Sequence, residues 1–341
     1  MDAAGRQSAG VYSRPEFAAV VPTSTSRNPG SLPRAGLDPA LLTPLRTNAH
    51  VLVEEWNALF SEGRIRTRMV AAAQRLSSPR AAASHTTAAA MHRLPLYQVR
   101  DDRVEMIVPV RGRRKGKDIV RHYTGLPDGD VVVIDGIRVT SLARTVYDVT
   151  RTASLEAAVV VFDASLRQIA WDDEDNTYDE DAAERFRERI WARIARNSGA
   201  RGIRQARFVA EFADGRAQGP GESIARLWMW QLGLPQPQLQ YRVDFADGSY
   251  SLLDFAWPEL GRWAEFDGKT KYTDAGILAG RTPEDVLRAQ QRREDKIREQ
   301  THWHCDRWGF SEMPGIDVFS RFLRSIGLHA VPAAARTLTR A

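Results

Sequence analysis

The chain has 341 residues, of which 43% are hydrophobic, and a net charge of +5, so it is long enough for two domains with packed cores. The single cysteine, Cys305, excludes an intramolecular disulfide and favours a reducing compartment, so we expect a cytoplasmic protein. Apolar runs such as 157–162 are too short to cross a bilayer, and the small basic excess is compatible with nucleic acid without demonstrating it.

The first third of the chain changes character near residue 49. Residues 1–48 are rich in Pro, Ser, Gly, Ala and Thr and show no periodicity, which predicts a disordered or loosely ordered tail. A helical pattern follows over 51–77, and Ser84 or Thr86 then suits the N-cap of a short helix. Apolar runs predict three strands after that helix, at 104–110, 118–124 and 131–136.

Two features of this region are candidate sites. His85 and His92 flank the short helix, but neither has a carboxylate or cysteine at the spacing of a metal motif, so ordinary structural roles explain them better. The segment 111–117, RGRRKGK, carries five positive charges in seven residues. It would suit DNA phosphates, and a solvated loop explains it equally well. The candidate DNA-binding residues in it are Arg113, Arg114 and Lys115.

Residues 137–151 predict a strand that leads into a helix, and 155–170 a second helix. The stretches SHTTAAAMHRLPL (84–96), VVVIDGIRVTSLARTVYDV (131–149) and LEAAVVVFDASLR (155–167) resemble proteins associated with AbiEi-type antitoxins, over roughly 50–167. Members of that family often begin with a DNA-binding winged helix-turn-helix, which residues 1–48 do not show. The resemblance therefore implies a common ancestry more than an antitoxin function, and an α+β domain at 49–170.

The next segment is acidic and predicts a domain boundary. Residues 171–186 hold many Asp and Glu and little apolar content, which favours an exposed connector. A helix with an apolar stripe rises from it at about 179–196. We therefore expect a linker and helix at 171–199, a second domain at 200–328 and a tail at 329–341.

The second domain has its own sequence of elements. Pro220 suits the first turn of a helix over 222–234. The pair Asp247-Gly248 indicates a hairpin turn, and Pro258 with Gly261 indicates another. The expected elements after that helix are strands at 239–246, 249–258 and 262–268, a charged helix at 281–300, a strand at 301–310 and a helix at 314–327.

Carboxylates gather on the second of these hairpins. Side chains alternate along a strand, so Glu265 and Asp267 lie on one face, and pairing with the preceding strand brings Asp254 near Glu265. Like charges this close need a cation or a proton between them, and hard oxygen ligands suit Mg²⁺ or Mn²⁺. Carboxylates on the solvent face of a hairpin are also common, and this ordinary explanation stays open.

The pattern around these carboxylates is more specific than the carboxylates alone. Glu222 in GES, Asp254 in LLDFAWP and the run AEFDGK, with Glu265, Asp267 and Gly268, occur in that order, followed by a charged helix and the strand HCDRWGF. Over about 217–312 the chain resembles the PD-(D/E)XK restriction-endonuclease-like superfamily, in its very-short-patch-repair endonuclease-like branch. The resemblance implies an α/β/α core with a mixed sheet, so the whole chain is expected to be α+β.

The resemblance also implies a Mg²⁺-dependent (or Mn²⁺-dependent) DNA endonuclease. Asp254, Glu265 and Glu222 would hold the metal, and Asp267 and Lys269 would join Asp254 and Glu265 in catalysis. The residues that would contact DNA from the charged helix are Arg288, Arg292, Arg293 and Lys296. The superfamily's Glu-x-Lys pattern would place Lys at 267, so the lysine's role would fall to Lys269 or Lys271.

The alternative is a non-catalytic DNA-binding regulator or antitoxin that keeps an inactive nuclease fold. Either function would fit a toxin–antitoxin or defence system, with a protein partner or a homodimer left open.

Overall fold

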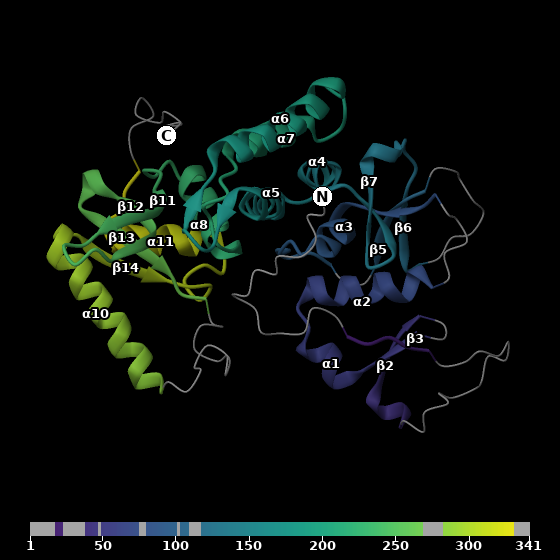
Figure 1. Cartoon of the computed structure of the whole chain (residues 1–341), viewed down its shortest axis with the longest axis horizontal. Helices are drawn as coiled ribbons and strands as arrows, with labels where there is room; N and C mark the ends of the chain where they lie inside the picture. Colours follow the sequence, from purple (N-terminus) through teal and green to yellow (C-terminus); the bar gives the residue numbers. More distant parts are fainter. Residues whose placement is uncertain are drawn as a thin grey trace. The chain divides into compact units, whose positions relative to one another are not determined.

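A computed structural model of the chain describes residues 18–22, 38–46, 49–74, 80–100, 103–108, 117–268 and 282–330. It divides into two compact units, Met1–Ala213 (unit 1) and Asp214–Ala341 (unit 2), each described here by itself (Figure 1). Both contain helices and mixed sheets, which confirms the expected α+β class. Within the described residues, no helix has the length and apolar character needed to cross a membrane.

The central sheet of unit 1 has five strands in the order β6-β5-β4-β8-β7. The pairs β4–β8 and β5–β6 are parallel, and β4–β5 and β7–β8 are antiparallel. Because β5 and β6 run side by side, Glu105 lies opposite Val120, and His122 lies opposite Ile107 two residues further along. The strands are β4 (Ala82–Ala83), β5 (Val104–Ile107), β6 (Ile119–His122), β7 (Val131–Ile134) and β8 (Ile137–Thr140).

Helices pack on this sheet through buried methionines and small residues. Met69, Met91, Met106 and Val139 belong to one hydrophobic cluster and join two helices to the sheet. Ser154 caps the N-terminus of α5 by accepting a hydrogen bond from the Ala157 amide. The helices are α2 (Ser61–Ala73), α3 (His85–Met91), α4 (Leu142–Thr152), α5 (Leu155–Ala170), α6 (Glu180–Arg196) and α7 (Ile203–Phe212), and a 3₁₀ turn η2 spans Asp128–Asp130.

A smaller three-stranded sheet, with the order β1-β3-β2, precedes α2. Its buried residues include Leu45, Val51 and Leu59, which pack with Ala71 of α2. Part of the region expected as a loose tail is therefore ordered on its own small core. The elements are β1 (Val21–Pro22), η1 (Pro39–Leu41), β2 (Leu42–Arg46), β3 (Ala49–Leu52) and α1 (Val53–Ala58).

The segment expected as a linker differs in the structure. Its acidic start forms a short antiparallel pair, β9 (Trp171–Asp172) with β10 (Thr177–Tyr178), and α6 follows directly. Phe186, on the buried stripe of α6, makes an edge contact with Phe162 of α5, with ring centroids 6.2 Å apart. Apolar spacing therefore outweighs acidity: α6 and α7 belong to unit 1, and the division falls after Ala213 rather than within 171–199.

Unit 2 is built on a four-stranded mixed sheet in the order β11-β12-β13-β14. The pairs β11–β12 and β12–β13 are antiparallel, and the pair β13–β14 is parallel, which the helical crossover between these two strands allows. The order of elements is the one that the sequence predicts. They are α8 (Pro220–Gln231), β11 (Gln238–Asp244), β12 (Tyr250–Trp257), η3 (Pro258–Leu260), β13 (Arg262–Phe266), α10 (Pro283–Thr301), β14 (His304–Trp308) and α11 (Ile316–Ser325).

Aromatic side chains hold these layers together. Trp263 of β13 is fully buried in one cluster with Ile297 of α10. Trp308 of β14 contacts Phe319 of α11, with ring centroids 5.7 Å apart. α10 begins with a capping box in which Thr282 and Asp285 bond reciprocally. The sheet is thus fixed against helices, and the side chains at the end of β13 have defined positions.

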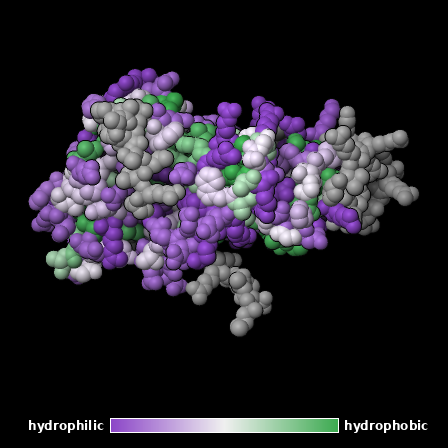
Figure 2. All heavy atoms as spheres, turned by 90° about the horizontal axis from the view of Figure 1, so that it is seen from above, coloured by the Kyte–Doolittle hydropathy of each residue, from purple (hydrophilic) through white to green (hydrophobic). Residues whose placement is uncertain are grey.

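Figure 2 shows mainly hydrophilic side chains on the face that it displays, with hydrophobic ones in small separate groups. Exposed apolar residues such as Leu260 and Leu287 occur singly, as they do on the surfaces of most folded proteins. The candidate functional sites among the described residues are therefore polar clusters.

Candidate functional site

The predicted carboxylates of unit 2 meet across β12 and β13. Phe255 pairs with Ala264 in this antiparallel ladder, so Asp254 lies opposite Glu265 one residue further along. Both side chains are buried, at 8% exposure each. Asp254 accepts a 2.9 Å hydrogen bond from the Phe266 amide through Oδ2 and a 3.4 Å bond from Gln240 Nε2 through Oδ1. We call Asp254, Glu265, Asp267 and the neighbouring Glu294 the acidic cluster.

Two arginines neutralise part of the acidic cluster. Glu265 forms ion pairs with Arg293 of α10 and with Arg307 of β14, the latter at 2.9 Å. Arg307 also reaches Asp267 at 3.4 Å and donates from Nε to Glu294 at 2.8 Å. Burial opposes the charge of Arg307, but Glu265 and Glu294 outweigh it and raise its pKa above the ordinary value. Three of these four carboxylates thus form ion pairs with the two guanidinium groups, and Asp254 is held by the Phe266 amide and Gln240.

The chemistry of the acidic cluster suits a hard cation, but its geometry is that of an ion-pair network. Carboxylate oxygens are the ligands that Mg²⁺ and Mn²⁺ prefer. Among the residues that the structure describes, however, Asp254, Glu265 and Asp267 do not form a group of three with all ligand atoms within 4.8 Å. The Arg307 guanidinium, which pairs with both Glu265 and Asp267, occupies the position that a bridging cation would take.

Glu222 lies in the first turn of α8, where Pro220 starts the helix. Its side chain is buried at 5% exposure, and Oε2 accepts a 2.8 Å hydrogen bond from the Gln218 amide. The preceding residue, Gly221, fits directly under the ring of Phe266, because a Cβ there would be 2.0 Å from Phe266 Cζ. The first turn of α8, which carries Glu222, therefore packs tightly against the end of β13.

The predicted DNA-binding residues of α10 divide into three groups. Arg288 and Arg292 are exposed on α10. Lys296 pairs with Asp247 at 2.6 Å, and this bond, together with hydrogen bonds from Ser249, lowers the pKa of Asp247 below its ordinary value. Arg293 is held by Glu265, as described above. The remaining predicted residues, Lys269, Arg113, Arg114 and Lys115, lie outside the described residues.

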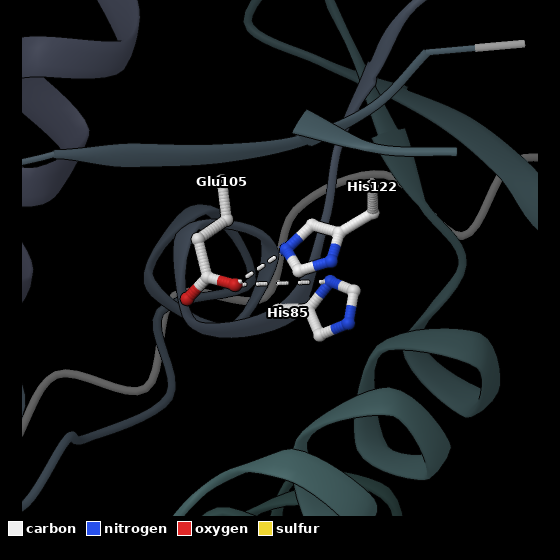
Figure 3. A group of neighbouring side chains, drawn as sticks. All are labelled: His85, Glu105 and His122. Carbon is white, nitrogen blue, oxygen red and sulfur yellow. Dashed lines mark hydrogen bonds and ion pairs between the residues drawn. The ribbon is translucent and has the colours of Figure 1, made fainter. Parts of the chain in front are cut away.

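Unit 1 contains a second cluster, formed by His85, Glu105 and His122, which we call the histidine cluster (Figure 3). His85 opens α3, Glu105 comes from β5 and His122 ends β6. His122 Nε2 is 2.8 Å from Glu105 Oε2, and His85 Nδ1 is 3.9 Å from the same oxygen. The two imidazole rings stack with centroids 3.7 Å apart and planes 20° from parallel. Two rings thus converge on one carboxylate oxygen.

Hydroxyl groups next to His85 fix the carboxylate. Thr86 donates to Glu105 Oε1 at 2.6 Å, and Thr87 accepts from the Glu105 amide at 2.8 Å. Burial tends to raise the pKa of Glu105, but the hydrogen bonds from His122 and Thr86 outweigh it and lower that pKa. Burial also lowers the pKa of His85. At neutral pH, Glu105 is therefore ionised and His85 is neutral.

Local spacing does not reveal the histidine cluster. Glu105 and His122 are both distant from His85 along the chain, and sheet pairing brings them together. The sequence does hold one signal: Glu105 and His122 each lie in a predicted strand, and both strands follow the helix that His85 begins. His92, the other candidate, lies apart: its Nε2 is 2.7 Å from the Thr140 carbonyl, and burial lowers its pKa.

Comparisons with known proteins identify similar chains but no activity. No family model matches the chain, and no solved structure does. The chain is similar to "Uncharacterized protein MT2308" of Mycobacterium tuberculosis (strain CDC 1551 / Oshkosh) and to "Uncharacterized protein Rv2248" of strain ATCC 25618 / H37Rv. Each is 35% identical over 134 residues, which are 39% of this chain and 44% of the relative. The chain therefore matches less than half the length of these relatives.

Proposed function

We propose that unit 2 is a metal-dependent DNA endonuclease that hydrolyses phosphodiester bonds with Mg²⁺ or Mn²⁺. The observation that carries the proposal is the meeting of two buried carboxylates, Asp254 and Glu265, across β12 and β13. Burying carboxylates costs free energy unless cations or hydrogen-bond donors compensate them, and in the structure Arg293 and Arg307 do so for Glu265. The resemblance to the PD-(D/E)XK superfamily and the order of elements in unit 2 support the same conclusion.

The residues of the acidic cluster would take distinct parts. Asp254 and Glu265 would hold the ion, with Glu222 as a further carboxylate. The bound ion would supply a water of lowered pKa and positive charge beside the phosphate. The Phe266 amide and Gln240 hold Asp254 in one orientation.

The neighbouring arginines would bind the substrate. Arg293 and Arg307, which pair with Glu265 in the structure, would turn to the phosphate oxygens, which guanidinium groups bind through two parallel hydrogen bonds. Asp267 and Lys269 would position the attacking water.

Helix α10 supplies the surface for the DNA backbone. Arg288, Arg292 and Lys296 follow one another at four-residue spacing and so lie on one side of the helix. Arg288 and Arg292 are exposed, as phosphate contacts must be. Each phosphate contact would make DNA binding weaker at higher salt. Arg113, Arg114 and Lys115 would add a second basic stretch in unit 1.

Plasmid nicking tests the proposal directly. Wild-type protein should nick supercoiled plasmid with Mg²⁺ and not with EDTA, and the Asp254→Asn and Glu265→Gln variants should lose about 10²-fold or more of that rate. The matched control is Asp244→Asn, because Asp244 is an exposed carboxylate of the same sheet that pairs with Arg242. Equal nicking by wild type, both site variants and the control would contradict the proposal.

One observation favours a second candidate, a DNA-binding regulator or antitoxin on an inactive nuclease fold. Glu265 already pairs with both Arg293 and Arg307, which is the arrangement of a closed structural network. Under this alternative, calorimetry with Mn²⁺ gives no heat and no plasmid is nicked, yet duplex DNA still binds with a steep dependence on salt.

A further inference from the structure

The histidine cluster presents three metal-binding side chains to one point. One ligand atom from each of His85, Glu105 and His122 lies within 4.8 Å of the other two. In a tetrahedral zinc site the bonds are about 2.0–2.1 Å long, so neighbouring ligand atoms are about 3.3 Å apart. The distances from Glu105 Oε2 to His122 Nε2 and His85 Nδ1, 2.8 and 3.9 Å, lie on either side of that separation.

A hydrogen bond from outside the histidine cluster orients its carboxylate. Thr86 bonds the second oxygen of Glu105 at 2.6 Å and leaves Oε2 directed at the two rings. Outer hydrogen bonds of this kind are what orient carboxylate ligands.

Hydrogen bonding within the histidine cluster does not by itself explain the position of His85. At 3.9 Å, its Nδ1 is too far from Oε2 for a hydrogen bond, and its bond is instead to Ser84 Oγ at 3.0 Å. Its backbone also has φ of +51°, a conformation that few residues other than glycine adopt. The chain thus holds a buried imidazole next to a carboxylate that it does not bond.

The site is reachable and needs only small movements. The side chains of Glu105 and His122 are 24% and 29% exposed, whereas His85 is at 7%. An ion in this position would have protein on one side and water on the other. The stacked rings must tilt apart for both to point at the ion, and the torsion that tilts them, χ2 of histidine, is a broad one.

We propose that His85, Glu105 and His122 bind a divalent transition-metal ion, of which Zn²⁺ suits the donors best. Two imidazoles and one carboxylate are the ligands of open zinc sites, in which water takes the fourth position. The same set of donors is poorly suited to Mg²⁺, which prefers oxygen ligands. This inference is independent of the endonuclease proposal, because it concerns different residues, a different unit and a different class of ion.

Metal titration of the full chain tests the proposal. Chelator-treated protein is titrated with Zn²⁺ by calorimetry and with Co²⁺ by visible absorption, both in excess Mg²⁺ so that sites made of oxygen ligands are filled. The wild type should bind one Zn²⁺ per chain and develop the visible Co²⁺ bands of a site with nitrogen ligands. The His122→Gln and Glu105→Gln variants should bind Zn²⁺ at least about tenfold more weakly and lose those bands.

Two controls separate this site from others. His329→Gln removes an exposed imidazole outside the histidine cluster, and Asp254→Asn removes a carboxylate of the acidic cluster; both should bind Zn²⁺ as the wild type does. Thermal melting in chelator checks that each variant is folded. The absence of Zn²⁺ uptake by the wild type, a measurement that needs no variant, would overturn the proposal. So would equal affinity in the wild type and folded His122→Gln and Glu105→Gln proteins.

Discussion

In the histidine cluster one carboxylate, Glu105, lies beside two imidazoles, whereas in the acidic cluster three carboxylates, Glu265, Asp267 and Glu294, form ion pairs with two guanidinium groups. Burial lowers the pKa of His85 and so favours its uncharged ring, which needs little compensation. Guanidinium groups keep their charge, so the acidic cluster is compensated by fixed cations. The first cluster therefore suits a borderline metal that binds neutral imidazole nitrogen, and the second a hard cation that competes with arginine.

The largest effect should follow from removing the arginine that links the acidic cluster. Arg307→Ala leaves Glu265, Asp267 and Glu294 without their shared partner, and should lower the free energy of unfolding by about 2–4 kcal/mol. Urea unfolding measures it. If a hard cation competes with arginine in this position, Mg²⁺ should restore more stability to Arg307→Ala than it adds to the wild type.

The matched control is Arg298→Ala, which removes an exposed arginine paired with Asp295 on α10. It should cost at most about 1 kcal/mol, because exposed pairs are screened by water. If Arg307→Ala cost no more than this control, the acidic cluster would not depend on fixed cations, and the contrast between the two clusters would be lost.

A smaller effect concerns acid, and it should appear in unit 1. Burial lowers the pKa of His92 below its ordinary value of 6.5, so the folded chain keeps it neutral where the unfolded chain takes up a proton. Stability from this residue is therefore complete above pH 6.5 and is lost as the pH falls towards the folded value. Hydrogen exchange at pH 8 and pH 5.5, corrected for intrinsic rates, should show α3 and β8 losing protection at the lower pH.

The variant His92→Gln keeps a hydrogen-bond donor for the Thr140 carbonyl but cannot titrate. It should reduce that loss of protection, whereas His304→Gln, which removes an exposed imidazole of unit 2, should leave it unchanged. An identical pH dependence in His92→Gln and the wild type would show that His92 does not contribute to the acid sensitivity of unit 1.

The smallest effect is a change in the reactivity of Cys305, which reports on the acidic cluster. Burial, followed by the charge of Glu294, raises the pKa of its thiol to about 12. The folded protein should therefore react slowly with a disulfide reagent at pH 8, and the protein in urea quickly. Glu294→Gln should speed the folded reaction modestly. Unchanged rates in that variant would mean that the charge of Glu294 does not raise the pKa of the Cys305 thiol.

The sequence predicts the order of elements in unit 2 because the turn and helix signals that determine it lie within short stretches of the chain. Asp254 and Glu265 belong to one hairpin whose turn residues, Pro258 and Gly261, are visible in the sequence, so alternation along two strands was enough to bring them together. The arginine network has no such local signal, because Arg307 reaches Glu265 through the parallel pairing of β13 with β14, across a long helical connection.

No comparable turn signal in the sequence predicts the histidine cluster. Its three side chains come from a helix and two parallel strands, and parallel pairing leaves no turn signal that fixes the register. The acidic composition near Asp172 likewise predicts an exposed connector. In the structure, the buried side chains of Phe186 and Ile190 pack α6 into unit 1 instead. Local rules failed wherever the decisive contact was remote in the chain.

The hydrogen atom at Gly221 sets a limit on how the acidic cluster can change. The ring of Phe266 lies where a methyl group would be, and that ring also makes an edge contact with Phe310, with centroids 5.0 Å apart. A larger residue at 221 must push α8 away from the end of β13 or turn the ring. A displacement of α8 would shift Glu222 relative to β13 although no charged residue had been substituted. The spacing between helix and sheet is therefore encoded by a residue with no side chain, and grafting the carboxylates onto another scaffold would fail without it.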